Sequence, residues 1–175
     1  SKATQSDIDT AVNNLQIGGR NLVLNSKGDS RDIFTDLFAT SIKELDGFES
    51  IRIRGRTETM DKRTPYMSVL PDTEYTLSFW YQMKGTEAEY TRVYSYPVTN
   101  YFDRLITDSN TSKWEYYSFT FKTHHSVSSL PLMFRLRSSK PNADAYLYVR
   151  NIKLEKGNKA TDWTPAPEDV EANIE

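Results

Sequence analysis

The sequence has no cysteine. This absence excludes disulfide bonds, zinc sites with cysteine ligands, iron–sulfur clusters and thiol nucleophiles. It leaves the compartment open, because a chain of 175 residues is long enough to bury a core that needs no disulfides. There is also no apolar run that approaches the roughly 20 residues needed to span a bilayer, so we expect no membrane insertion.

A large excess of charge of either sign is lacking as well. The 22 basic and 24 acidic residues give a net charge of −2, so the chain as a whole lacks the basic character of a nucleic-acid-binding protein. Aromatic residues are abundant instead, with 11 Tyr, 8 Phe and 3 Trp. This excess is typical of strands rather than helices.

Short segments that alternate, or that carry aromatic and β-branched residues, follow one another from Arg20 to Leu154. Turn signals such as Pro71-Asp72, Lys84-Gly85 and Pro141-Asn142 separate several of them. Because no long helix lies between them, they predict an all-β fold, an antiparallel sandwich or barrel. Segment 26–48 is ambiguous between strand with loop and a short helix. The expected strands are 21–25, 49–55, 66–70, 74–82, 91–98, 114–122, 130–138 and 145–154.

Helix-like segments stand at both ends of this β region. Ser6 and Asp9 have the spacing of a capping box, and Gly18-Gly19 would end the first helix. Pro167 suits a first helical position, and the acidic residues after it suit the positive end of a helix dipole. These helices either dock on their own domain or belong to a coiled-coil stalk shared with other chains.

We therefore predict an N-terminal helix over 1–19, a β-sandwich over 20–164, and the start of a C-terminal helix or linker over 165–175. Because the chain starts at Ser1 and shows no signal peptide, we expect it to be cut from a longer polypeptide.

Two stretches carry a resemblance to a known family. "QIGGRNLVLNS" (16–26) and "NIKLEKGNKATDWTPAPED" (151–169) resemble the first and last segments of β-sandwich domains in bacteriophage tail fibres and tail-tip proteins. The interior "YTLSFWY" (75–81) and "WEYYSFTF" (114–121) are similar to jelly-roll carbohydrate-binding modules. The resemblance implies a jelly roll and a location in the virion, outside any cell. It also implies a homotrimer joined through the flanking helices, with a host cell-wall polysaccharide as partner.

The jelly-roll resemblance further implies a strand order, in which 49–55, 130–138, 74–82 and 91–98 share one sheet. The other sheet would hold 21–25, 145–154, 66–70 and 114–122. Alternation within the first group then places one set of side chains on its outer face. We predict a carbohydrate-binding surface there, formed by Arg52, Arg54, Trp80, Gln82, Tyr94, Tyr96, Arg135 and Arg137.

The chemistry of these side chains fits a glycan. Aromatic rings offer flat apolar platforms for sugar rings, and arginine pairs with carboxylate or phosphate. An anionic wall polysaccharide therefore matches the surface better than a neutral one. The alternative is that these residues form ordinary cross-strand pairs, or pack on a neighbouring subunit, in a structural spacer or trimerisation domain without a ligand.

Signs of catalysis are lacking. His124 and His125 are adjacent, so in a strand they would point to opposite faces and would not share one metal. Carboxylate pairs such as Asp29 and Asp32 have nothing nearby to separate their pKa values. We expect a non-enzyme without a cofactor, with a polysaccharide hydrolase as a distant third hypothesis. The resemblance implies a structural Ca²⁺ near the last strand, but Arg150 stands where many relatives have an acidic residue, so we predict no metal.

Overall fold

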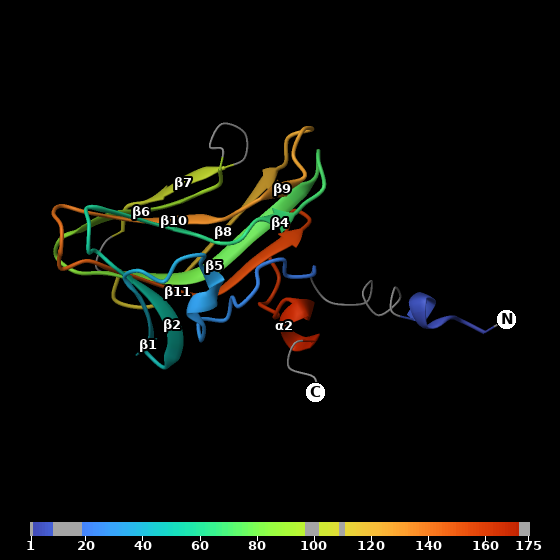
Figure 1. The fold of residues 1–175 in the computed structure, drawn as a ribbon, viewed down its shortest axis with the longest axis horizontal. Helices are drawn as coiled ribbons and strands as arrows, with labels where there is room; N and C mark the ends of the chain where they lie inside the picture. The colour runs from blue at the N-terminus through green and yellow to red at the C-terminus, as the bar shows by residue number, and fades with distance from the viewer. Residues whose placement is uncertain (1, 9–18, 97–101, 109–110, 172–175) are drawn as a thin grey trace.

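The strands of the protein form two facing antiparallel layers (Figure 1). The computed structural model describes residues 2–8, 19–96, 102–108 and 111–171. The predicted β-sandwich of the jelly-roll type is confirmed. Among the described residues no helix is long and apolar enough to cross a membrane. The elements are η1 (Arg31–Ile33), β1 (Thr40–Leu45), β2 (Phe48–Arg54), β3 (Thr59–Arg63), β4 (Met67–Ser68), β5 (Glu74–Lys84), β6 (Ala88–Tyr94), β7 (Asp103–Ile106), β8 (Glu115–Lys122), β9 (Ser129–Leu130), β10 (Met133–Ser138), β11 (Tyr146–Lys156) and α2 (Pro167–Glu171).

One layer is a five-stranded sheet in the order β1-β2-β11-β5-β8. Its central strand β11 and the neighbouring strand β5 are each 11 residues long and pair antiparallel, with an irregularity between Arg150 and Lys153. The inward side chains of β5 alternate, as the sequence predicts for a strand with one core face. The outer side chains Ser78 and Gln82 are nevertheless buried, so other parts of the chain cover this face.

The second layer is a four-stranded sheet in the order β3-β10-β6-β7, with a two-stranded sheet of β4 and β9 beside it. Strand β10 shows the alternation most clearly. Phe134 and Leu136 are fully buried, whereas Arg135 and Arg137 are partly exposed on the other side. Because adjacent strand residues point to opposite faces, the arginines lie on the outer face of this sheet.

The core lies between the two sheets. Phe79 of β5 and Phe134 of β10 meet edge to face there, with ring centroids 5.3 Å apart, a geometry that aromatic pairs favour. Ile51, Ile53 and Leu147 are also fully buried in this cluster. Burying each of these side chains stabilises the fold by about 1.5–3 kcal/mol.

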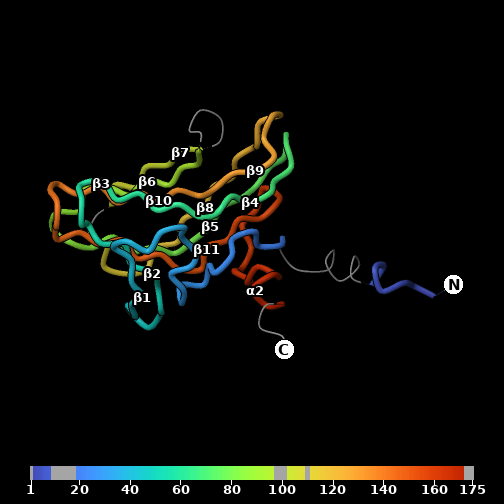
Figure 2. The backbone as a smooth tube through the Cα atoms, in the orientation of Figure 1, coloured from blue at the N-terminus to red at the C-terminus, as the bar shows by residue number. Residues whose placement is uncertain are grey.

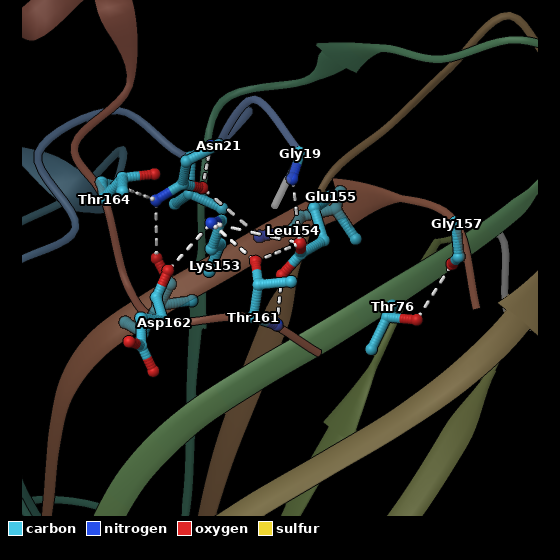
Figure 3. Close-up of polar contacts among 12 residues, drawn as sticks. Gly19, Asn21, Thr76, Lys153, Leu154, Glu155, Gly157, Thr161, Asp162 and Thr164 are labelled. Atoms are coloured by element: carbon cyan, nitrogen blue, oxygen red, sulfur yellow. Dashed lines mark hydrogen bonds and ion pairs between the residues drawn. The ribbon is translucent and has the colours of Figure 1, made fainter. Parts of the chain in front are cut away.

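The segments on either side of the sandwich are tied together through Asn21 (Figure 3). Its amide nitrogen donates to Ser26 Oγ, Ile152 O and Thr164 O, and its Oδ1 accepts from the backbone of Val23 and Leu154. Every hydrogen-bonding position of this buried side chain is therefore used. Figure 2 shows residues 19–27 running beside β11 and α2, and the Asn21 bonds explain why this stretch stays there.

A buried lysine lies in the same region (Figure 3). Lys153 is fully buried, and its ammonium donates to Thr161 Oγ1 at 2.9 Å and to the Asp162 carbonyl at 2.8 Å. Burial lowers the pKa of Lys153, and the nearby Glu155 carboxylate opposes that shift. Glu155 in turn accepts from the backbone of Gly19 and Thr161. The cluster links β11 to the segments that precede and follow the sandwich.

The chain enters and leaves the sandwich at neighbouring points. Arg20 and Glu168 form an ion pair, and Asp169 accepts a 2.7 Å hydrogen bond from the backbone of Asn25. Helix α2 begins at Pro167. Most of the expected N-terminal helix lies outside the described residues; within 2–8 the capping pair is Thr4 and Asp7, each of which bonds the backbone of the other. Ser6, the expected capping residue, lies within the helical residues 5–8, and its expected partner Asp9 lies outside the described residues.

Several strand predictions need correction. Residues 21–25 form no strand, because Asn21 places this segment beside β11 through side-chain bonds and a single backbone bond from Leu22 to Leu154. The expected strand 66–70 shrinks to the two residues of β4. The ambiguous segment 26–48 contains both η1 and β1. Asp46 and Gly47 have positive φ angles of 45° and 87° and join β1 to β2, as a tight hairpin turn requires.

Candidate functional site

The outer face of the five-stranded sheet carries a row of polar and aromatic side chains in register. Arg52 of β2 pairs with Tyr148 of β11, which pairs in turn with Gln82 of β5. Paired residues point to the same side of a sheet, so the three side chains lie next to one another. Tyr146 lies two residues along β11, and the Arg52 guanidinium sits 4.9 Å from the centroid of its ring.

The neighbouring row is more aromatic. Arg150 pairs with Trp80, and Trp80 pairs with Tyr116 of β8. The rings of Trp80 and Tyr116 are 5.0 Å apart. The Arg150 guanidinium lies 5.0 Å from the Trp80 ring, 4.6 Å from Trp114 and 3.7 Å from Phe48. Burial lowers the pKa of Arg150, and the surrounding ring faces attract its charge.

The tip of the β1–β2 hairpin bends over this face. Asp46 Oδ2 accepts a 2.7 Å hydrogen bond from Gln82 Nε2. The Leu45 carbonyl accepts a 3.0 Å bond from the indole of Trp114. The hairpin therefore crosses from the edge of the sheet to β5 and to the segment just before β8. This explains why Gln82, expected to be an exposed binding residue, is fully buried.

Hydrogen-bonding capacity on this face is incompletely used. In the described ranges, three buried side-chain polar atoms have no hydrogen-bond partner: Arg52 Nε, Gln82 Oε1 and Arg150 Nε. All three belong to the two rows just described. Buried polar atoms are nearly always paired in native proteins, by protein, water or ligand. The two arginine N–H groups are donors suited to hydroxyl or carboxylate oxygens, and the amide oxygen is an acceptor suited to a hydroxyl hydrogen.

The outer face of the four-stranded sheet is different, because its arginines already have carboxylate partners. Arg135 donates to both oxygens of Asp61, at 2.7 and 3.0 Å, and Arg92 donates to Asp103 at 2.6 Å. Hydrogen bonding to Asp61 raises the pKa of Arg135. Arg137 lies 3.5 Å from Glu58 and 3.7 Å from Glu89. These are the ordinary cross-strand pairs that the alternative interpretation of the sequence expects.

The predicted grouping of strands in one sheet is wrong. Arg52, Arg54, Trp80 and Gln82 lie on β2 and β5 of the five-stranded sheet; Arg135, Arg137 and Tyr94 lie on β10 and β6 of the four-stranded sheet, and Tyr96 follows β6. The eight residues thus form two groups on different layers rather than one surface. The physical reason is that β11 pairs with both β2 and β5 and brings them into its own sheet.

The sequence interpretation missed the residues of β11. Tyr146, Tyr148 and Arg150 alternate with buried residues in a segment that was expected to be a strand, so their outward direction was predictable. Their assignment to the opposite sheet concealed them. The hairpin turn at Asp46-Gly47 could also be predicted from the sequence, because Asp-Gly between apolar runs is a strong hairpin signal. Tyr94 is buried, which raises its pKa, and Tyr96 is exposed.

The two histidines behave differently from the prediction. They follow the last residue of β8, and their rings are 3.9 Å apart rather than on opposite faces. The reason is that the chain leaves the strand at Lys122, so strand alternation no longer applies. His124 Nδ1 bonds Ser126 Oγ at 2.8 Å. In the residues that the structure describes, no group of three or more His, Asp or Glu side chains has the arrangement of a metal site.

Comparison with known proteins defines the fold. No family model and no curated protein matches the sequence. Among solved structures, a family 16 carbohydrate-binding module is similar with a TM-score of 0.59 and 18% identity, over 77% of this chain and 99% of that one. A family 61 module in complex with β-1,4-galactotriose gives a TM-score of 0.54 and 11% identity, over 79% of this chain and 99% of that one. The chain has the fold of carbohydrate-binding modules.

A phage protein is also similar. The enzymatically active domain of tailspike protein 4 from bacteriophage CBA120 gives a TM-score of 0.52 and 10% identity. The match covers 78% of this chain but 21% of the tailspike chain. At this identity the likeness concerns the β-sandwich alone.

Proposed function

We propose that the protein is a non-catalytic carbohydrate-binding module that binds a glycan on the outer face of its five-stranded sheet. The binding residues would be Arg52 and Trp80, already expected from the sequence, together with Tyr148 and Tyr116. Gln82, also expected, is buried beneath the β1–β2 hairpin and would hold that hairpin in place rather than touch the glycan. The observation that carries the proposal is the coincidence, on one face, of aromatic rings with the partly exposed Arg52 side chain, whose Nε has no hydrogen-bond partner. Sugar rings present both C–H faces and hydroxyl groups, so they would satisfy both.

Two features support this face over the opposite one. The arginines of the four-stranded sheet are bound to carboxylates of their own chain, so a ligand would have to displace those partners. On the five-stranded sheet, Tyr116 has 45% of its surface exposed beside the Trp80 ring, which leaves an accessible aromatic surface. The galactotriose complex of a similarly folded module supports a carbohydrate as the ligand class.

The test is a binding screen with matched variants on the two layers. The parent protein is screened against wall polysaccharides by affinity electrophoresis, and the best ligand is then titrated by calorimetry. Tyr148→Ala and Tyr116→Ala should each weaken binding about tenfold, which corresponds to about 1.4 kcal/mol. Tyr96→Ala and Arg137→Ala, on the other layer, should bind like the parent. Loss of binding in the second pair but not the first would move the site to the four-stranded sheet.

The biological setting that we propose is a phage tail fibre or tail-tip protein, in which the module helps the virion adhere to a host cell-wall polysaccharide. The terminal motifs and the structural likeness to a tailspike domain support it. Residues 19–25 and 163–171 lie side by side, so the module would project from a stalk rather than extend it. This geometry favours adhesion over the alternative of an in-line structural spacer.

Binding and assembly are tested separately. The fluorescently labelled protein should bind Gram-positive cells, and purified wall polysaccharide should compete. Light scattering of the chain with its flanking helices should give three times the monomer mass if those helices form a trimer. A protein that is trimeric but binds no cell or polysaccharide would support the spacer function instead.

A further inference from the structure

A cluster of arginines lines a shallow hollow at the β1–β2 edge of the five-stranded sheet. The hollow has a volume of about 470 Å³. Strand β2 contributes two of its arginines, η1 contributes one, and the segment after β2 contributes the fourth. The lining residues that matter here are Arg31, Arg52, Arg54, Arg56, Phe38 and Ser41.

Two of these arginines are fixed by neighbouring groups. Arg31 donates from Nε to Thr40 Oγ1 at 3.1 Å and from Nη2 to the Leu37 carbonyl at 2.8 Å. The Nε of Arg56 donates to Asn142 Oδ1 at 3.1 Å, and its guanidinium lies 5.7 Å from the centroid of the Phe38 ring. The partners are hydroxyl, carbonyl, amide and ring groups. They orient the guanidinium groups without neutralising them.

The second feature of this hollow is the charge of its arginines. Within the described parts of the chain, none of its four arginines forms an ion pair, whereas Arg92, Arg135 and Arg137 on the other sheet all do. Of the residues that the structure describes, no Asp or Glu lines the hollow. Like charges held close together repel one another, and an anion bound between them would replace this repulsion by attraction to each guanidinium group. Arg52 Nε adds a buried donor that lacks a partner.

We propose that this hollow is an anion subsite, which takes a phosphate or carboxylate group. Both groups present oxygen acceptors that match the planar fork of a guanidinium. The hollow adjoins the aromatic rows, because Arg52 lines it and also lies against the Tyr146 ring. This subsite rests on the proposed glycan-binding function, and it specifies which class of glycan the protein binds. The glycan is acidic, its sugar rings lie on the aromatic face, and its charged substituent enters the arginine hollow.

The hollow itself is tested with small probes. D-galacturonate and D-galactose differ only in oxidation at C6, and inorganic phosphate carries the anion alone. In NMR titrations at constant ionic strength, galacturonate and phosphate should shift the Nε–H signal of Arg52 and the backbone amide of Arg54 saturably, whereas galactose should not shift the Arg54 amide. Equal shifts with galactose and galacturonate, or no saturable shift with either anion, would overturn the anion subsite.

The variant for the test is Arg54→Gln with Arg56→Gln, because both side chains are exposed. Its matched control is Arg63→Gln with Arg104→Gln, which removes the same charge at exposed positions of the other sheet. The first variant should bind both anions about tenfold more weakly or worse, and the control should bind like the parent. Arg54→Gln alone serves as a second variant should the double one fold poorly. An equal loss in both double variants would show general charge attraction and overturn the subsite.

The two hypotheses can fail independently. Suppose that neutral oligosaccharides bind and Tyr148→Ala abolishes this binding, but acidic polysaccharides bind Arg54→Gln/Arg56→Gln like the parent. The proposed function then stands and the anion subsite is wrong. If instead phosphate binds in the hollow but no polysaccharide binds the protein, the subsite stands and its acidic-glycan ligand is wrong together with the proposed function.

Discussion

Asp46 accepts a 2.7 Å hydrogen bond from the side-chain amide of Gln82. Asp46 lies in the turn of the β1–β2 hairpin, and Gln82 lies near the end of β5, with the whole of β11 between the two strands in the sheet. The bond therefore holds the hairpin over the aromatic rows. It also leaves Gln82 with a free carbonyl oxygen and fixes the direction in which that acceptor points.

Removing this carboxylate should affect both stability and binding. Asp46→Ala leaves the buried Gln82 amide without its acceptor, so we expect a loss of about 1–2 kcal/mol in the free energy of unfolding. Glycan affinity should fall as well, because the hairpin loses one of its attachments above the binding face. Urea unfolding and calorimetry measure the two effects. Glu44→Ala, at an exposed position of the same hairpin, should change neither quantity, and an equal effect of the two substitutions would contradict the role of the bond.

The buried amide of Asn21 gives a larger expected effect. Asn21→Ala would leave the backbone N–H groups of Val23 and Leu154 and the carbonyls of Ile152 and Thr164 without this partner. We expect a loss of about 2–4 kcal/mol in the free energy of unfolding, since each buried group left unpaired costs about 1–3 kcal/mol. Urea unfolding measures it.

Asn21→Asp is the informative companion to this substitution. The carboxylate keeps the two acceptor bonds but loses the donors to Ser26, Ile152 and Thr164. If Asn21 acts through its full set of bonds, this variant should also be destabilised, and Asn158→Ala at an exposed turn position should not. A stability of Asn21→Ala equal to that of the parent would contradict the role of Asn21 as the link between the terminal segments.

Substitutions at two glycines in tight turns distinguish the cost of backbone strain from the cost of a steric clash. Gly85 and Gly47 both have positive φ angles, of 104° and 87°. A Cβ on Gly85 would lie 2.1 Å from the Asp144 carbonyl oxygen, whereas a Cβ on Gly47 would meet no atom of the described residues within 4 Å. Gly47→Ala should therefore cost about 1–2 kcal/mol from the backbone alone. Gly85→Ala should cost more, about 3 kcal/mol or above, because the clash adds to the same strain.

Thermal or urea unfolding of the two glycine variants provides the comparison. The difference between them is the informative quantity, because both share the cost of the left-handed conformation. Equal losses would show that the Lys84-Gly85 turn relaxes away from Asp144 without penalty.

The fold class could be predicted from the sequence, because the alternation of apolar and polar side chains along a strand is a local property. In "MFRLRS" and "SIRIR", apolar side chains alternate with arginines, and both segments became strands with the arginines outward. Alternation carries no information about which strands pair, and pairing decides the site. Arg52 and Arg135 have the same local pattern, but one lies beside the aromatic rows and the other beside Asp61. The resemblance supplied the wrong order for these strands.

The remaining features of the site depend on long-range contacts. The hairpin bond from Asp46 to Gln82 joins residues 36 positions apart, and the burial of Arg150 needs rings from β2, β5 and the segment before β8. No short window of sequence contains such contacts. The outward direction of Tyr146 and Tyr148, in contrast, could be predicted within one strand. A sequence interpretation that treated every strand's outer residues equally would have found them.

The ion pair between Lys62 and Asp36 predicts how stability depends on pH. The Lys62 side chain is almost fully buried, with 2% exposed, and its ammonium lies 2.6 Å from Asp36 Oδ1. The hydrogen bond from Lys62 holds the pKa of Asp36 below its ordinary value. The contribution of this pair is therefore complete above the unfolded pKa of aspartate, about 3.9, and is lost as the pH falls through the lower folded value. Stability followed by urea unfolding from about pH 6 down to about pH 2 should decline more in the parent than in Asp36→Asn.

At neutral pH the same pair gives a double-mutant test. Asp36→Asn leaves the buried Lys62 ammonium without its carboxylate, and we expect a loss of about 1–3 kcal/mol. Lys62→Met removes the charge and keeps a side chain of similar length against the Phe38 ring. In this background Asp36→Asn should cost little, since replacing both partners of a buried pair is far milder than removing one. If Asp36→Asn costs as much in the Lys62→Met background as in the parent, the two residues act independently, and the low-pH decline must come from other carboxylates.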